Sequence, residues 1–264
     1  MRVAPADRTA SDGSPYPDRA RASFERDVRA MFTHIAQRYE WFDHLASLGQ
    51  DYLWRPRALW DLEKFRRGRP VRRLLDIGCG TGELTRLAAR RFRDARVVGA
   101  DFTAAMVDLA AHRTRNHPSA PRVAFARANA LHLPFADASF DVVLSAFVAR
   151  NLPRLPDAFA ELRRVLVPGG TVLTLEITEP PSSLVRWGFH AYFDRVVPAL
   201  GAAVRSAGPY RYLPESLRHL PRRDAILGML RSAGCPRVAA PYQSFGIVTA
   251  FLAEAGPAPL VQRG

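Results

Sequence analysis

The sequence predicts an α/β protein with a doubly wound parallel sheet, and three observations indicate this fold. Short apolar runs alternate with segments of helical period between residues 71 and 177. A glycine-rich turn follows the first of these runs, as is typical of ligand-binding sheets of this class. The chain has 264 residues, of which 48% are hydrophobic, so it can bury one full core and we expect a single domain.

The elements follow one another in a regular order. Strands are predicted over 71–77, 96–100, 122–128, 140–147 and 171–177, with helices between them over 83–92, 104–115 and 156–166. A last helix over 223–233 stops at Gly234. Two further strand-like runs, 237–244 and 247–253, meet at Gly246 and can pair as a hairpin.

Three segments lie outside this alternation. Residues 1–22 are rich in Pro, Ser, Asp, Arg and Ala, so we expect a disordered tail ahead of a domain over 23–264. Apolar residues at helical spacing over 24–45 predict an amphipathic segment, and a helical lid over about 24–60. The aromatic segment over about 180–222 is too long for a plain connection and is expected to be a substrate-side insertion, either a wall over the acceptor or an ordinary subdomain core.

Composition limits the partners. Two cysteines, with no Cys/His cluster, give no disulfide framework and predict no metal site. No signal peptide or run of about 20 apolar residues is visible, so we expect a cytoplasmic protein, at most peripheral to the inner face of the membrane. The net charge of +13 favours either anionic partners or a general arginine bias on solvated faces. Because the basic residues form no clustered stripe, no nucleic acid partner is expected.

The strongest local signal is the strand and turn over 74–82, which carries three glycines, Gly78, Gly80 and Gly82. Glycines let the main chain approach a ligand closely. The spacing is G-x-G-x-G, with Asp76 before it and Glu83 after it, and so differs from the dinucleotide pattern G-x-G-x-x-G. Carboxylates repel a pyrophosphate but suit the ammonium and sulfonium groups of S-adenosylmethionine. This cofactor is therefore favoured over NAD.

A second acid supports the same site. Asp101 ends a strand about 20 residues beyond the loop, where a carboxylate can bind both hydroxyls of a ribose. The alternative is that Asp101 only caps the helix that starts near Thr103.

From about Met31 to Ala253 the chain resembles the ubiquinone/menaquinone biosynthesis C-methyltransferases, a family of class I methyltransferases. The discriminating pieces are the Met31–Tyr39 segment, Arg150-Asn151 just past a strand, and Tyr210–Leu213. Val148-Ala149 stands where the family usually has Gly-Leu. The resemblance implies a Rossmann-like, seven-stranded sheet with an antiparallel last strand, and S-adenosylmethionine across the C-terminal strand ends. The cofactor-binding residues that it implies are Asp76, Gly78, Gly80, Gly82, Asp101, Phe102, Asn129 and Ala130, with Asn129 and Ala130 beside the adenine.

The resemblance also implies a reaction, the ring C-methylation of a demethylated menaquinol or ubiquinol precursor. A ring carbon becomes nucleophilic when a neighbouring hydroxyl loses its proton, and a cation or hydrogen-bond donor must then hold the oxyanion. Arg150 is the candidate for that role, Asn151 for orienting substrate or cofactor, and Tyr39 for closing the pocket from the lid. The alternative for Arg150 is an ion pair with an acid at a strand end.

Other functions remain open at this level. They are methylation of a natural-product phenol or of phosphatidylethanolamine, and a non-catalytic homologue that only binds the cofactor. A peripheral membrane contact, favoured by a lipid-like substrate, and a homodimer are kept as hypotheses.

Overall fold

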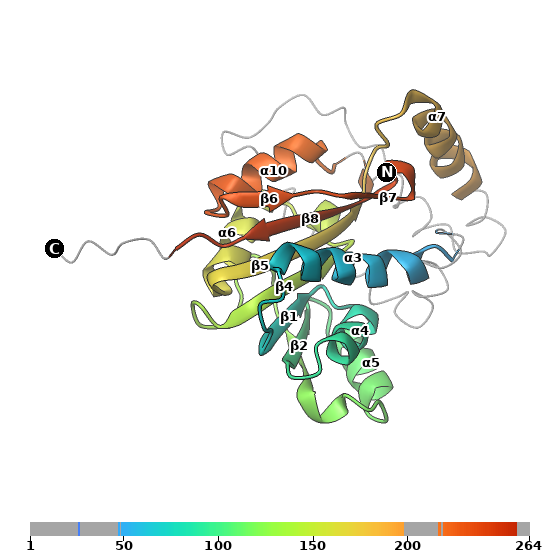
Figure 1. Ribbon diagram of the computed structural model, residues 1–264. Helices are drawn as coiled ribbons and strands as arrows, with labels where there is room; N and C mark the ends of the chain where they lie inside the picture. The colour runs from blue at the N-terminus through green and yellow to red at the C-terminus, as the bar shows by residue number, and fades with distance from the viewer. Residues whose placement is uncertain (1–25, 27–46, 48, 198–215, 218, 258–264) are drawn as a thin grey trace.

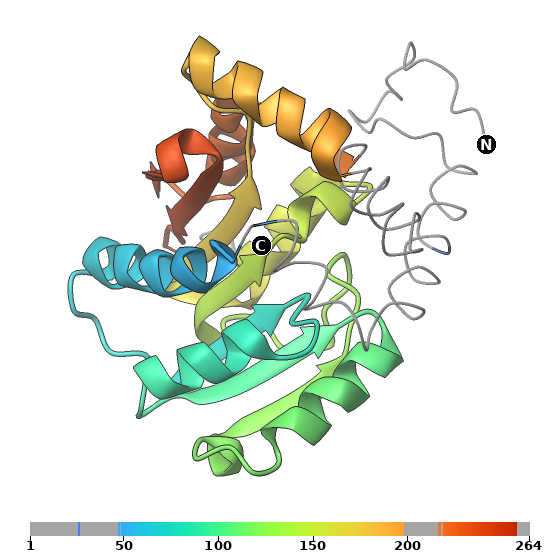
Figure 2. The same ribbon diagram turned by 90° about the vertical axis from the view of Figure 1, so that its right-hand side faces the viewer.

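The structure is a computed structural model that describes residues 26, 47, 49–197, 216, 217 and 219–257. In this part of the chain one twisted sheet forms the centre, with helices packed on both of its faces (Figures 1 and 2). The predicted tail over 1–22 and the lid candidate Tyr39 lie outside the described residues.

The sheet has the predicted doubly wound order, β3-β2-β1-β4-β5-β8-β6. Strands β1 to β5 are parallel, and the last strand, β8, is antiparallel to β5, as expected. The strands are β1 (Arg73–Ile77), β2 (Arg96–Asp101), β3 (Val123–Arg127), β4 (Phe140–Ala146), β5 (Leu166–Ile177), β6 (Arg237–Ala239), β7 (Tyr242–Gln243) and β8 (Val248–Glu254).

Seven of these strands form the continuous order given above. The eighth, the short β7, pairs with β8 alone. The predicted strand over 237–244 is divided between β6 and β7, and Pro241 lies in the gap. Proline has no N–H to donate to a ladder, so the run cannot continue as one strand through this position. The predicted hairpin across Gly246 is confirmed, because β7 and β8 pair antiparallel.

Side chains alternate between the two faces of the central strands. Leu74 and Leu144 belong to the core beneath α3 and α4, while Leu75 and Val143 belong to the core beneath α6 and α10. The helices and helical turns are α3 (Asp51–Arg66), α4 (Glu83–Arg91), α5 (Ala104–Thr114), η2 (Ala120–Arg122), η3 (Ala149–Asn151), α6 (Leu155–Val165), α7 (Ser183–Ala191), η4 (Tyr192–Val196), α10 (Arg223–Ser232) and η5 (Ser244–Gly246). Both faces are covered, which is the arrangement that parallel strands require.

The proposed lid is described only at its C-terminal end. Residues 51–60 begin α3, whose Trp54 and Leu59 are buried in the core over the sheet. The indole N–H of Trp54 donates to Ser244 Oγ at 2.7 Å, which ties α3 to the turn before β8. This end of the segment is therefore a fixed layer of the fold.

The predicted insertion over 180–222 is described up to residue 197 and again from 219, with 216 and 217 between. It begins with α7, which continues into the π-helical turn η4. Phe189 and Phe193 pack against each other and belong to the same buried cluster as Ile177, so this part of the aromatic cluster is core. Trp187, on the same helix, is exposed. Tyr210 and Tyr212 lie outside the described residues.

Candidate active site

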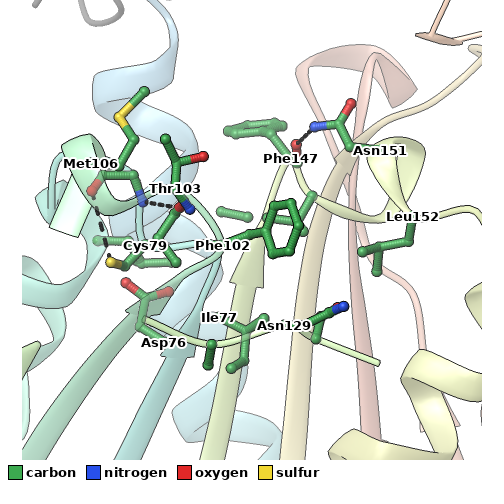
Figure 3. A pocket seen from close by; sticks show the side chains of 18 of the residues that line it. Asp76, Ile77, Cys79, Phe102, Thr103, Met106, Asn129, Phe147, Asn151 and Leu152 are labelled. Carbon is green, nitrogen blue, oxygen red and sulfur yellow. Dashed lines mark hydrogen bonds between the residues drawn. The ribbon is translucent and has the colours of Figure 1, made fainter. Parts of the chain in front are cut away.

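A cavity opens at the C-terminal ends of β1, β2 and β4 (Figure 3). Its free space, including the open mouth, is about 1190 Å³. Seven of the eight predicted cofactor-binding residues line it, which are Asp76, Gly78, Gly80, Asp101, Phe102, Asn129 and Ala130. Gly82 does not line it; it precedes α4 and lies against Ala110 and Phe125.

The glycine loop adopts backbone angles that favour glycine. Gly78 has φ of +63° and Gly80 has φ of +52°, both in the left-handed region. A Cβ placed on Gly78 would lie 2.3 Å from Val148 Cγ2, whereas a Cβ on Gly80 would meet nothing within 4 Å. Gly78 thus lets the turn after β4 pack against the loop, and Gly80 leaves open space at the cavity.

Asp101 faces this loop from the end of β2. Its Oδ2 accepts a hydrogen bond from the Gly80 N–H at 3.0 Å, and its Oδ1 accepts one from the Thr103 N–H at 2.8 Å. Burial raises the pKa of Asp101, and these backbone hydrogen bonds oppose that rise. The contact to Thr103, at the start of α5, agrees with the capping alternative. A carboxylate has about four lone-pair sites, so both oxygens retain capacity for the hydroxyls of a ribose.

Asp76 lies deeper, at the end of β1. It accepts a hydrogen bond from the Thr85 hydroxyl at 2.5 Å. Complete burial raises its pKa to about 7, although Thr85 and the positive charge of Arg55 oppose the rise. A cationic ligand group beside Asp76 would favour its ionised form.

Arg55, a residue of α3, also lines the cavity, although nothing in the sequence pattern around it predicts a site residue. Its Nη1 lies 3.3 Å from Glu83 and 3.2 Å from Asp51. Glu83 is therefore paired with a cation, and the carboxylates left to face a cationic ligand are Asp76 and Asp101. Arg55 lies about 20 residues before the glycine loop. A separation of this size in the sequence does not predict that Arg55 contacts Glu83.

The loop after β3 brings Asn129 and Ala130 to the cavity. Asn129 Oδ1 accepts a hydrogen bond from the Leu131 N–H at 3.0 Å. The side-chain carbonyl of Asn129, which the resemblance places beside the adenine, thus already has one partner and retains one lone pair for an adenine amino group. Phe102 follows Asp101, and Figure 3 places its side chain in the same cavity.

The turn after β4 forms the opposite wall. Phe147 takes φ of +61° and leads into η3, from which Asn151 reaches the cavity. The Asn151 side-chain amide donates to the Phe147 carbonyl at 3.4 Å (Figure 3). Arg150 does not line the cavity: its Nη1 lies 3.2 Å from Glu176, and both side chains are buried. The structure therefore shows the ion pair that was the alternative for Arg150.

Comparison with known proteins gives matches over most of the chain. The model of the ubiE/COQ5 methyltransferase family matches residues 20–254. A demethylmenaquinone methyltransferase of Thermus thermophilus is 41% identical over 206 residues, covering 77% of this chain and 90% of the relative. A ubiquinone/menaquinone biosynthesis C-methyltransferase of Geobacter sulfurreducens is 35% identical over 230 residues, covering 87% and 88%.

Among solved structures, a methyltransferase of Thermotoga maritima that depends on S-adenosylmethionine aligns with a TM-score of 0.58 at 16% identity. The alignment covers 86% of this chain and 98% of that one, and at this identity it supports the fold alone. The family match, the relatives and the acidic glycine-loop cavity together lead to one conclusion. The chain belongs to the ubiE/COQ5 methyltransferase family, whose fold and cofactor class, S-adenosylmethionine, it shares.

Proposed function

We propose that this protein transfers a methyl group to a ring carbon of a demethylated menaquinol or ubiquinol precursor. The observation that carries the proposal is a pair of carboxylates, the buried Asp76 and the half-buried Asp101, beside an open glycine loop. The names of the relatives support the acceptor class.

The cavity fits S-adenosylmethionine. Asp101 would hold the ribose, Asn129 and Ala130 would lie beside the adenine, and Asp76 would favour the cationic amino-acid end. Open space at Gly80 leaves room for the ligand at the loop. When bound, this cofactor supplies a methyl group on a sulfonium, so the protein has mainly to align the acceptor and exclude water.

The acceptor would lie against the wall formed by Phe147, Val148 and Asn151. We assign Asn151 to orient a ring hydroxyl, and Tyr39 to close the pocket. The guanidinium carbons of Arg55 and Arg150 lie 5.5 and 5.6 Å from the centre of the Phe147 ring. Arg55 shares its charge with Asp51 and Glu83, so at this wall it would support a phenolate, the form in which the ring carbon is nucleophilic, through its N–H donors more than through free charge. Arg150, paired with Glu176, would act from behind the wall.

The test is methyl transfer with the purified protein. Labelled S-adenosylmethionine and a demethylmenaquinol analogue should give a product methylated at ring carbon, located by mass spectrometry and NMR. Natural-product phenols and phosphatidylethanolamine serve as competing acceptors. Cofactor binding without transfer to any acceptor would instead support a non-catalytic homologue. Tight binding of NAD, with none of S-adenosylhomocysteine, would reject the whole assignment.

We also propose that the protein contacts an anionic membrane, where a prenylated quinol is dissolved. Leu184 and Trp187 on α7 are 76% and 73% exposed, and Arg186 and Arg195 lie on the same helical segment. In the described residues no helix has both the length and the apolar character needed to cross a bilayer. The net charge of +13 favours anionic lipid.

Co-sedimentation with phosphatidylglycerol vesicles tests this contact. The double substitution Leu184→Ser with Trp187→Ser should reduce binding at least tenfold. Trp60→Ser, which alters an exposed aromatic residue on α3, is the control and should leave binding unchanged. Equal binding of all three proteins would reject the contact. Light scattering of the purified protein without vesicles tests the hypothesis of a homodimer.

A further inference from the structure

Glu176 is a buried carboxylate that the proposed reaction does not use. It lies next to the last residue of β5 and has no exposed surface. Its Oε1 accepts a hydrogen bond from the backbone N–H of Ala149 at 2.6 Å, and its Oε2 accepts one from Arg150 Nη1 at 3.2 Å. Both partners belong to η3, the turn that follows the neighbouring strand β4 (Figure 1).

This turn is an unusual piece of backbone. Phe147 has φ of +61°, a region that costs a residue with a large side chain about 1–2 kcal/mol, so surrounding contacts must hold it. One contact is the Phe147 N–H, which donates to the Leu175 carbonyl at 2.7 Å and extends the pairing of β4 with β5. After Phe147, the hydrogen bonds of Glu176 to Ala149 and Arg150 join the turn to β5.

The turn shapes the cavity. Val148 packs against Gly78, and Asn151 reaches the cavity while its amide donates to the Phe147 carbonyl (Figure 3). A shift of η3 would therefore move the acceptor wall while leaving the bonds of Asp101 to Gly80 and Thr103 intact.

The chemistry of the pair explains why Arg150 lies behind the wall. Burial raises the pKa of Glu176, and the charge of Arg150 with the N–H of Ala149 opposes that rise. A buried carboxylate needs a counter-charge and donors to stay ionised, and Arg150 supplies both. Within the described part of the chain, Arg150 Nε has no hydrogen-bond partner, and Nη1 donates to Glu176.

We propose that Glu176 is a positioning residue, which fixes η3 through the Ala149 N–H and so places Val148 and Asn151 at the acceptor, with Arg150 as its counter-ion. The consequence for the reaction rests on the proposed function. The positioning itself does not.

Two double variants separate the hydrogen bond from the charge. Glu176→Gln with Arg150→Met keeps an oxygen for the Ala149 N–H, and Glu176→Leu with Arg150→Met removes it. Neither leaves an unpaired buried charge, so both are expected to fold even where a single substitution of Glu176 would not. Hydrogen exchange of the peptide 146–152, measured without ligand, should match wild type in the first and be at least tenfold faster in the second.

Asp141→Asn is the matched control, because Asp141 accepts from two backbone N–H groups, those of Arg72 and Arg73, at the N-terminal end of β4, away from η3. It should leave exchange of 146–152 unchanged. Equal exchange in the two double variants would overturn the proposal, whether or not any acceptor is methylated.

Kinetics supply the second readout. In Glu176→Leu with Arg150→Met, KM for the quinol should be about tenfold higher than in Glu176→Gln with Arg150→Met, while Kd for S-adenosylhomocysteine stays within twofold, because the cofactor loop keeps its own bonds. An equal rise in KM for the quinol and in Kd for S-adenosylhomocysteine would indicate a general structural defect and reject the positioning role. Absence of turnover in the wild type would reject the proposed function and leave the exchange result as the test of Glu176.

Discussion

Two glycines of the same loop should respond differently to the same substitution. Gly78→Ala and Gly80→Ala each put a Cβ on a residue with positive φ, which costs about 1–2 kcal/mol of folding free energy. At Gly80 the new methyl group meets nothing within 4 Å. At Gly78 it would lie 2.3 Å from Val148 Cγ2, and overpacking of this kind adds about 1–3 kcal/mol. We expect losses of about 1–2 kcal/mol for Gly80→Ala and about 2–5 kcal/mol for Gly78→Ala.

Urea unfolding of the ligand-free protein, followed by circular dichroism, measures both losses. Val148→Ala removes the two Cγ atoms that the new methyl group would meet, so in that background Gly78→Ala should cost no more than Gly80→Ala. The two variants should also differ in binding. Both glycines line the cavity, but only at Gly80 would the added Cβ enter open space, so Gly80→Ala should weaken the binding of S-adenosylhomocysteine at least tenfold despite its smaller loss of stability. Equal losses of stability, or a loss at Gly78 that Val148→Ala does not relieve, would show that the contact between the two walls is misassigned.

Three further predictions concern the carboxylates and the acceptor wall. Asp101→Asn replaces one acceptor oxygen by a donor that would face an N–H of Gly80 or Thr103, and calorimetry should show affinity for S-adenosylhomocysteine at least tenfold lower; unchanged affinity would contradict the ribose role. Burial raises the pKa of Asp76 from 3.8 to about 7, so the folded state binds an extra proton between these values, and stability should fall as pH rises from 5 to 7 by up to about 1.4 kcal/mol per pH unit more than in Asp76→Asn. Denaturant unfolding at several pH values measures this difference, and parallel pH profiles would show that Asp76 titrates normally. Asn151→Ala should lower kcat for the quinol at least tenfold with cofactor affinity within twofold, and an equal loss in both would place Asn151 at the cofactor instead.

Much of the fold is local information, and the sequence carries it. The alternation of apolar runs with helical periods predicts β1 to β5 and the helices between them, and the bounds agree to within a few residues, except that β5 begins five residues early. Asp76, the glycine loop and Asp101 are predictable as one site because the carboxyl ends of adjacent parallel strands meet at one edge of the sheet. The run over 237–244 is divided at Pro241 because proline has no backbone N–H, and the apolar periodicity by itself does not predict this break.

The partners of the charged side chains depend on the tertiary structure. Arg55 reaches Glu83 because α3 packs over the sheet beside α4, and Arg150 meets Glu176 because β5 lies next to β4. Ion pairs form between groups that lie within about 4 Å in space, and residues 26 or 28 positions apart in the chain have no local pattern that records such a distance. The sequence by itself therefore determined the architecture and the cofactor edge. Only the packing of distant segments decided which cation faces the cavity and which one lies buried behind its wall.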